Sequence, residues 1–264
     1  MSEKIFITSL HLAGTAAVFW ILMLAVFRKK CGRAVVSTVT GLRREKNYRL
    51  GGIMLIAGIA VNFILVILQN RGVISPAVDF TGALLNRERS VVEFFQNYRF
   101  FYLDYTAAFA YFLLFPALLL FVMPVLDYTG NVKALEQYLC ALSIALFIAV
   151  PCFVLIEVRE VWMNFAPGTY FSSSEICQAM FNLRSFNFPG NCFPSIHTAL
   201  TVIAMYCVCK TKCPYYIILA TAGGLLILAS ILVLGIHWIT DMLAGGLTAL
   251  AALKVAAMLQ KNKN

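Results

Sequence analysis

The sequence has few charged residues: Asp, Glu, Lys and Arg make up 12% of its 264 residues, whereas 61% are hydrophobic. A soluble domain of this composition would have too little polar surface, so its apolar side chains must face lipid. The sequence also lacks a P-loop, a dinucleotide-binding fingerprint, a metal-ligand cluster and an internal repeat. Its chemistry must therefore be sought in the polar residues that interrupt apolar segments.

Apolar runs account for most of the chain. A helix of about 20 residues crosses a hydrocarbon core of about 30 Å. Seven runs fit this requirement: 5–27, 52–69, 101–124, 136–157, 194–209, 215–235 and 238–259. The fifth is short and has a polar start, so we expect it to begin at a cavity or inside the membrane. The sequence predicts an all-α polytopic bundle of about seven transmembrane helices, with residues 1–264 as a single membrane domain.

The formal charge of +9 raises the question of a nucleic-acid partner, but the distribution of charge argues against one. Basic residues gather between the first two predicted helices: Arg28, Lys29, Lys30, Arg33, Arg43, Arg44, Lys46 and Arg49. Such a cluster beside a span marks the cytoplasmic side. We expect residues 1–50 to form a helix plus a basic cytoplasmic loop and 51–264 to form the core. The carboxyl terminus is then cytoplasmic and the amino terminus outside.

Two outer loops follow from this topology. Residues 70–100 alternate apolar and charged side chains, which favours an amphipathic interfacial helix for part of them. The loop 160–193 is aromatic, and its 172–175 segment offers a capping box for a short helix that ends near Arg184. This loop also holds Cys177 and Cys192, the two cysteines assigned to the outer side. A disulfide between them is a hypothesis for an oxidising compartment.

Two polar segments begin near the outer ends of the last three helices. His197 follows Pro194 and Ser195, and His237 precedes Asp241 by four residues. On a helix this spacing puts imidazole and carboxylate one turn apart, about 6 Å between Cβ atoms. The carboxylate would fix the tautomer and leave the other ring nitrogen free to attack or to accept a proton. The third histidine, His11, is interpreted as a structural hydrogen-bonding residue between helices.

These segments resemble the second and third motifs of the type 2 phosphatidic acid phosphatase superfamily, P-S-G-H and S-R-x5-H-x3-D. Residues 194–197 keep three of the four positions of the first, and Ser230, His237 and Asp241 keep the spacing of the second. Ile196 and Ile231 replace a glycine and an arginine, and no K-x6-R-P motif precedes them. In these departures the chain is similar to inositol phosphorylceramide synthases, and it shares the histidine-aromatic-x-x-aspartate pattern with sphingomyelin synthases.

The resemblance implies a six-helix core over the second to seventh helices and a phosphohistidine mechanism. His237, oriented by Asp241, would attack phosphorus, and His197 would protonate the departing oxygen. Neither metal nor cofactor is implied, and membrane lipids would be the substrates. Phosphate oxygens would be held by Ser195 at a helix amino terminus and by Ser230. Because the motif lysine and arginine are missing, Arg159 at the end of the fourth helix and Arg184 are the candidate cations.

Three functions remain open on this basis. Transfer to a lipid hydroxyl gives a phospholipid headgroup transferase, which we favour, acting at the periplasmic, extracellular or lumenal face. Transfer to water gives a phosphatase of lipid phosphates or polyprenyl diphosphates. A lipid or ion transporter is a third possibility, although transporters usually carry inverted repeats. The sequence leaves the donor, the acceptor and the oligomeric state open.

Overall fold

The computed structural model of the chain describes residues 2–97, 100–166, 169–174, 188 and 190–261. Within them, six helices are long and apolar enough to cross a membrane, and a shorter apolar helix adds a seventh element. These elements are α1 (Ser2–Phe27), α3 (Lys46–Asn70), a broken helix α5–η2–α6 (Phe101–Phe109, Ala110–Leu114, Phe115–Tyr128), α7 (Val132–Leu155), α9 (Ile196–Cys209), α10 (Pro214–Val233) and α11 (Ile239–Lys261). Each predicted apolar run falls on one of them. The chain is therefore an all-α, polytopic integral membrane protein.

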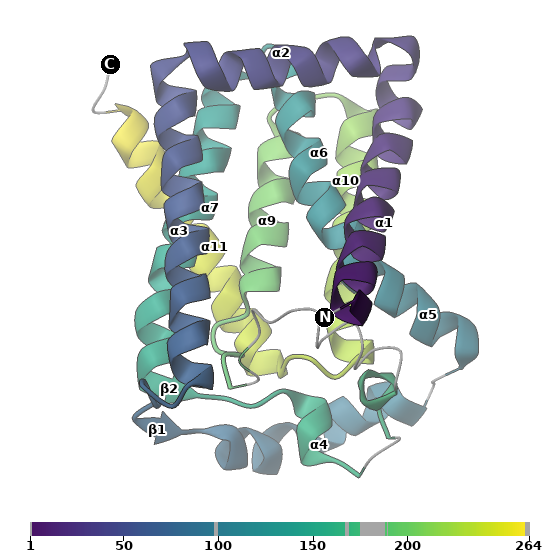
Figure 1. Ribbon diagram of the computed structural model, residues 1–264, viewed down its shortest axis with the longest axis vertical. Helices are drawn as coiled ribbons and strands as arrows, with labels where there is room; N and C mark the ends of the chain where they lie inside the picture. The colour runs from purple at the N-terminus through teal and green to yellow at the C-terminus, as the bar shows by residue number, and fades with distance from the viewer. Residues whose placement is uncertain (1, 98–99, 167–168, 175–187, 189, 262–264) are drawn as a thin grey trace.

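The predicted basic loop after the first helix is wrong, because the structure has helix there. The turn η1 (Arg28–Lys30) leads into α2 (Cys31–Arg44), which lies across one end of the bundle (Figure 1). Ala34 and Thr38 are buried on the face of α2 that meets the bundle. Ser37 and Thr38 donate to the Asp127 carboxylate of α6 over 2.8 and 3.3 Å. Residues 31–44 are therefore an amphipathic helix with one buried face, although their basic charge suggested a loop. The division of the chain at residue 50 stays a prediction.

The third span changes its helical pattern partway along. The π-helical turn η2 separates α5 from α6, and Pro116 stands in the first turn of α6. Pro116 has no N–H to offer the Phe112 carbonyl in an α-helical pattern. His11 Nε2 of α1 lies 2.8 Å from that oxygen. The interhelical hydrogen bond expected of His11 is therefore confirmed.

The core lies where α7, α9 and α11 pack together. Alanines are fully buried there, which lets the helices approach closely: Ala141, Ala145, Ala199, Ala204, Ala249 and Ala252. A polar contact links α7 to α11, because Gln137 Nε2 donates to the Leu253 carbonyl over 3.1 Å. Tyr138 likewise donates to the Leu119 carbonyl over 2.9 Å. Three tightly packed helices therefore form a rigid support for the residues at their ends.

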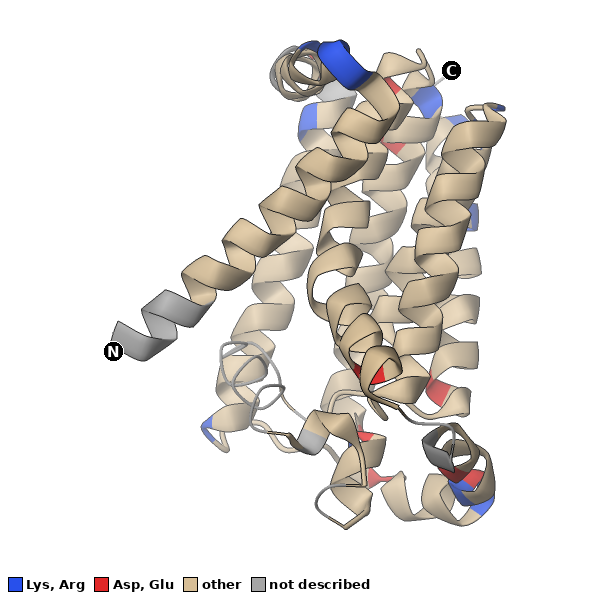
Figure 2. Ribbon diagram, turned by 90° about the vertical axis from the view of Figure 1, so that its right-hand side faces the viewer, with Lys and Arg blue, Asp and Glu red and all other residues tan. Residues whose placement is uncertain are grey.

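The other end of the bundle carries a cap of short elements (Figure 1). There β1 (Val78–Asp79) pairs in parallel with β2 (Ile156–Glu157), and α4 (Thr81–Asn97) confirms the expected amphipathic helix. The turns η3 (Val161–Asn164) and η4 (Phe171–Ser173) complete the cap. Figure 2 shows basic residues at the end crossed by α2 and both signs of charge around the cap. The predicted helix 136–157 ends earlier, at Leu155, because the chain turns into β2.

Candidate active site

The two histidine motifs come together at the capped end of the bundle. The ring centroids of His197 and His237 lie 5.7 Å apart. The backbone also joins the motifs, because the Ser195 N–H donates to the Asp241 carbonyl oxygen over 3.0 Å. The convergence expected from sequence is therefore observed, and one phosphate group can bridge two imidazoles at this separation.

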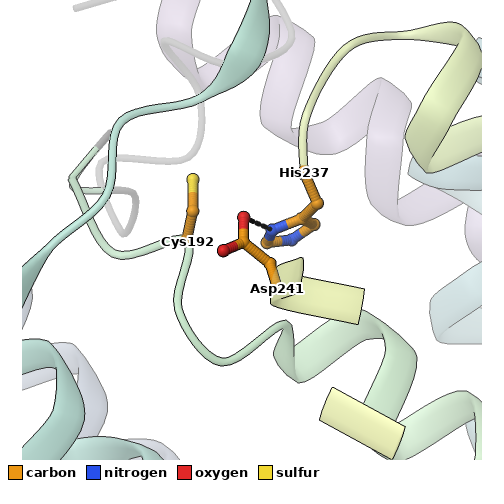
Figure 3. A group of neighbouring side chains, drawn as sticks. All are labelled: Cys192, His237 and Asp241. Carbon is orange, nitrogen blue, oxygen red and sulfur yellow. Dashed lines mark ion pairs between the residues drawn. The ribbon is translucent and has the colours of Figure 1, made fainter. Parts of the chain in front are cut away.

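His237 stands on the connection between α10 and α11, next to its carboxylate (Figure 3). Asp241 is fully buried in the first turn of α11, and its Oδ2 lies 3.5 Å from His237 Nδ1. The same oxygen accepts the Trp238 backbone N–H over 3.0 Å. Because Nδ1 faces the carboxylate, Nε2 is the ring nitrogen available to a substrate. The arrangement suits a histidine nucleophile whose positive form is stabilised by a neighbouring anion.

The connection that carries His237 is held from two sides. Gly235 has φ +65°, a backbone conformation that residues with a side chain rarely adopt. A Cβ added at this position would also lie 2.3 Å from the Tyr170 ring. The Trp162 backbone N–H donates to the Gly235 carbonyl over 2.9 Å. Trp238 is fully buried and its indole N–H donates to the Arg159 carbonyl over 2.9 Å. The loop is thus anchored immediately before and after His237.

His197 lies in the first turn of α9, between two aromatic rings. Its imidazole centroid is 4.7 Å from the Tyr111 ring and 4.8 Å from the Phe115 ring. Tyr111 belongs to η2, and π-helical turns of this kind often occur at functional sites. The break in the third span therefore supplies one wall for the second histidine.

A cavity of about 280 Å³ contains both histidines. Its walls are largely apolar, with Ile59, Phe63 and Val66 of α3 facing Leu146 and Phe153 of α7. The polar and titratable residues that line it are Asn62, Tyr111, Glu160, Asn191, Cys192, His197 and His237. No lysine or arginine lines it among the described residues. Among the described lining residues, the donors available to an anion are neutral groups and the two imidazoles.

The serines proposed as phosphate ligands lie elsewhere in the described structure. Ser195 is the N-cap of α9 and is fully buried, and its Oγ accepts the Thr198 backbone N–H and hydroxyl over 3.3 and 3.1 Å. Helix α9 starts at Ile196, so Pro194 precedes the cap instead of taking the first helical position. Ser230 donates to the Ile227 carbonyl within α10 over 2.7 Å. Neither serine lines the cavity, and a phosphate-binding role for them stays a prediction.

Arg159, the proposed cation that the structure describes, does not line the cavity. Arg159 follows β2, so its predicted position on a helix end is wrong. Its guanidinium pairs with Glu157 over 2.8 Å and with Asp79 over 3.6 Å, and its side chain is 51% exposed. The hydrogen bond to Glu157 raises the pKa of the guanidinium further. The geometry gives no support to Arg159 as a phosphate ligand. Arg184 lies outside the described residues, as does most of the short helix expected before it.

Sequence reasoning missed two residues of the cavity, Glu160 and Asn191. Glu160 is 3% exposed and accepts the Trp162 indole N–H. Asn191 forms a reciprocal amide pair with Gln69 at the end of α3, over 2.7 and 3.1 Å. The nearby Trp162, two residues along the chain, was the local signal for Glu160. Nothing local distinguishes Asn191, because its partner lies 122 residues away.

Cys192 lies next to His237 and Asp241, which we call the dyad (Figure 3). Ligand atoms of Cys192, His237 and Asp241 lie within 4.8 Å of one another, so the group is a candidate metal site within the described residues. The thiol donates to the Ile236 carbonyl over 3.6 Å. Burial raises the pKa of the Cys192 thiol well above its ordinary value, and the charges of Glu160 and Asp241 add to this. Cys192 is a thiol in this structure, which does not support the disulfide predicted with Cys177, a residue that lies outside the described ones.

Fold and site together define a polytopic membrane protein with a two-histidine cavity at one end of its helices. Residues 141–264, which contain both motifs, match the model of the PAP2 superfamily. The match supports a relation of this part of the chain to the PAP2 superfamily, whose members are phosphatases or phosphotransferases. No curated protein and no solved structure matches the chain.

Proposed function

We propose that this protein is a lipid phosphotransferase that forms a phosphohistidine on His237. The observation that carries the proposal is the pair of imidazoles, 5.7 Å apart between centroids and lining one cavity, of which one lies beside a buried carboxylate. A structural histidine pair would not need an open cavity between α3 and α7. The fully buried carboxylate of Asp241, within the spanning helix α11, is also costly to keep there, which favours a functional reason for it.

The reaction divides into two displacements. His237 Nε2 attacks phosphorus while His197, as imidazolium, gives its proton to the departing oxygen, so that the P–O bond breaks as the P–N bond forms. Neutral His197 then takes the proton of the acceptor hydroxyl, whose oxygen displaces His237 from phosphorus. The proton returned to His197 restores the starting state. Asp241 stabilises the positive imidazole that this cycle requires at His237.

The charge of the cavity favours a phosphodiester as donor. Among the described residues that line the cavity, Glu160 is the carboxylate, and none is a lysine or arginine. A phosphomonoester close to its dianion would be poorly compensated there, whereas a phosphodiester carries one negative charge. This supports transfer of a phospholipid headgroup over hydrolysis of a lipid phosphate. It agrees with the motif departures at Ile196 and Ile231, although membership of a particular branch is part of the proposal.

The distribution of basic residues supports a location of the cavity on the non-cytoplasmic side of the membrane. The cavity lies at the end of the bundle opposite α2. Exposed Arg33 of α2 and the basic residues of η1, Arg28–Lys30, are typical of the cytoplasmic side. The site then serves the outer leaflet, on the periplasmic, extracellular or lumenal face. The apolar walls of α3 and α7 would receive the acyl chains, so membrane lipids are the proposed substrates.

The test is trapping of the intermediate. Purified protein is incubated with phospholipids labelled with ³²P, with and without ceramide or diacylglycerol, and the chain is analysed for acid-labile, base-stable label. We expect label on wild type and on His11→Gln, and none on His237→Ala, with transfer to the added lipid hydroxyl. Release of free headgroup phosphate regardless of acceptor would instead identify a phosphatase. Flux of lipid or ions that survives His237→Ala, without label, would identify a transporter.

A further inference from the structure

The start of α11 is bound by a side chain from a distant helix. The first N–H groups of any helix lack partners within it, and they attract anions. Helix α11 begins at Ile239, two residues after His237. Glu88 of α4 lies at this point: its Oε2 is 2.7 Å from the Ile239 nitrogen, and its Oε1 is 3.1 Å from the Thr240 nitrogen. The Thr240 hydroxyl donates to the same carboxylate.

Packing holds α4 in place for this contact. Val92 of α4 is 3% exposed, and it belongs to a small apolar cluster with Trp238 and Tyr170. Leu84 and Leu85 of α4 pack against the same cluster. Helix α4 therefore packs its apolar residues in one cluster with Trp238, the residue after His237. Glu88 of the same helix binds the next two residues, Ile239 and Thr240. The geometry of the histidine connection depends on a helix that the matched family region, 141–264, does not include.

We propose that Glu88 is a positioning residue for the reaction. Its carboxylate fixes the amino terminus of α11, and this fixes the distance and orientation between His237 and Asp241, which lie on either side of the bonded N–H groups. The inference rests on the proposed function for its effect on turnover, but the effect on the position of His237 is independent of it. Glu88 does not line the cavity and does not touch the reacting atoms.

Variants of α4 separate this role from a general effect on folding. Glu88→Ala removes both acceptors, whereas Glu88→Gln keeps one carbonyl oxygen. Glu93→Gln is the matched control, because Glu93 lies on the same helix and pairs only with the exposed Arg89 among the ion pairs described. We expect Glu88→Ala to lower kcat at least tenfold, with the KM for the donor lipid within twofold of wild type. Glu88→Gln should recover part of the loss, and Glu93→Gln should match wild type.

Two readouts do not depend on activity. Amide exchange at Ile239 and Thr240 should quicken in Glu88→Ala, while exchange in α9 stays unchanged. Modification of His237 by diethyl pyrocarbonate should also quicken, with His11 as the internal reference. If both rates match wild type, or if both change and kcat does not, the positioning role is overturned. If wild type has no transferase or phosphatase activity, the proposed function fails, and the two rates still decide whether Glu88 positions His237. If Glu88→Ala does not fold, Glu88→Gln decides by the same measurements.

Discussion

The Ser195 backbone N–H donates to the carbonyl oxygen of Asp241 over 3.0 Å, so the chain that enters α9 is fixed to the first turn of α11. One turn further along α11, Gly245 lies against the same residue. A Cβ added at Gly245 would lie 2.4 Å from the Ser195 carbonyl oxygen and 3.0 Å from Thr198 Cβ. The two histidine motifs are therefore joined by a hydrogen bond and by a close approach that a side chain would prevent.

Gly245→Ala should consequently damage both stability and turnover. The new methyl group meets backbone, which cannot rotate away, and overpacking of this kind typically costs about 1–3 kcal/mol. Separating α9 from α11 also moves His197 from His237. We expect a lower midpoint of thermal unfolding in detergent and at least a tenfold loss of turnover. Gly246→Ala is the control, because no atom lies within 4 Å of the added Cβ. Equal behaviour of the two variants would contradict the close approach.

Asp241→Asn tests the charge of the dyad while preserving its shape. The asparagine carbonyl oxygen can still accept the Trp238 N–H, so the turn should stay intact. The amide does not stabilise a positive imidazole, and we expect turnover to fall by about 10² to 10⁴. Less ³²P label should accumulate on His237 at early times. Wild-type rates of labelling in a folded Asp241→Asn protein would show that the carboxylate has no part in activating His237.

Arg159→Lys tests the cation proposed from sequence. The guanidinium is half exposed and pairs with Glu157 and Asp79, and exposed pairs contribute about 0–1 kcal/mol. Because it does not line the cavity, we expect turnover within twofold of wild type. Glu157→Gln, which removes the stronger partner, should behave in the same way. A tenfold loss in Arg159→Lys alone would mean that the guanidinium leaves these carboxylates to bind phosphate during the reaction.

The helices and the dyad could be predicted because each depends on local pattern. Apolar runs of sufficient length gave the spans, and the four-residue spacing of His237 and Asp241 gave their shared turn. Charge bias put His197 at the same end, and the structure agrees. These signals come from residues close together in the chain, where periodicity is directly readable.

The surroundings of the dyad depend on contacts between distant segments, which one sequence does not encode locally. Glu88 reaches Thr240 across 152 residues, and Asn191 reaches Gln69 across 122. The error on Arg159 has the same origin: a two-residue pairing of β1 with β2 ends α7 early and turns the side chain toward Asp79. The basic residues around 31–44 suggested a loop. The structure has α2 there, and the contacts of its buried face with α6 join residues about 90 positions apart in the chain.

The last prediction concerns metal dependence at Cys192. A metal ligand must be a thiolate, whereas the Cys192 thiol keeps its proton to donate to the Ile236 carbonyl over 3.6 Å. A serine can make the same donation. We therefore expect EDTA to leave turnover unchanged and Cys192→Ser to retain at least a third of wild-type turnover. The contrary result has a specific form: EDTA abolishes turnover, Zn²⁺ restores it, and Cys192→Ser prevents the restoration. Cys192, His237 and Asp241 would then be metal ligands, and His237 Nδ1 would bind the ion in place of facing Asp241.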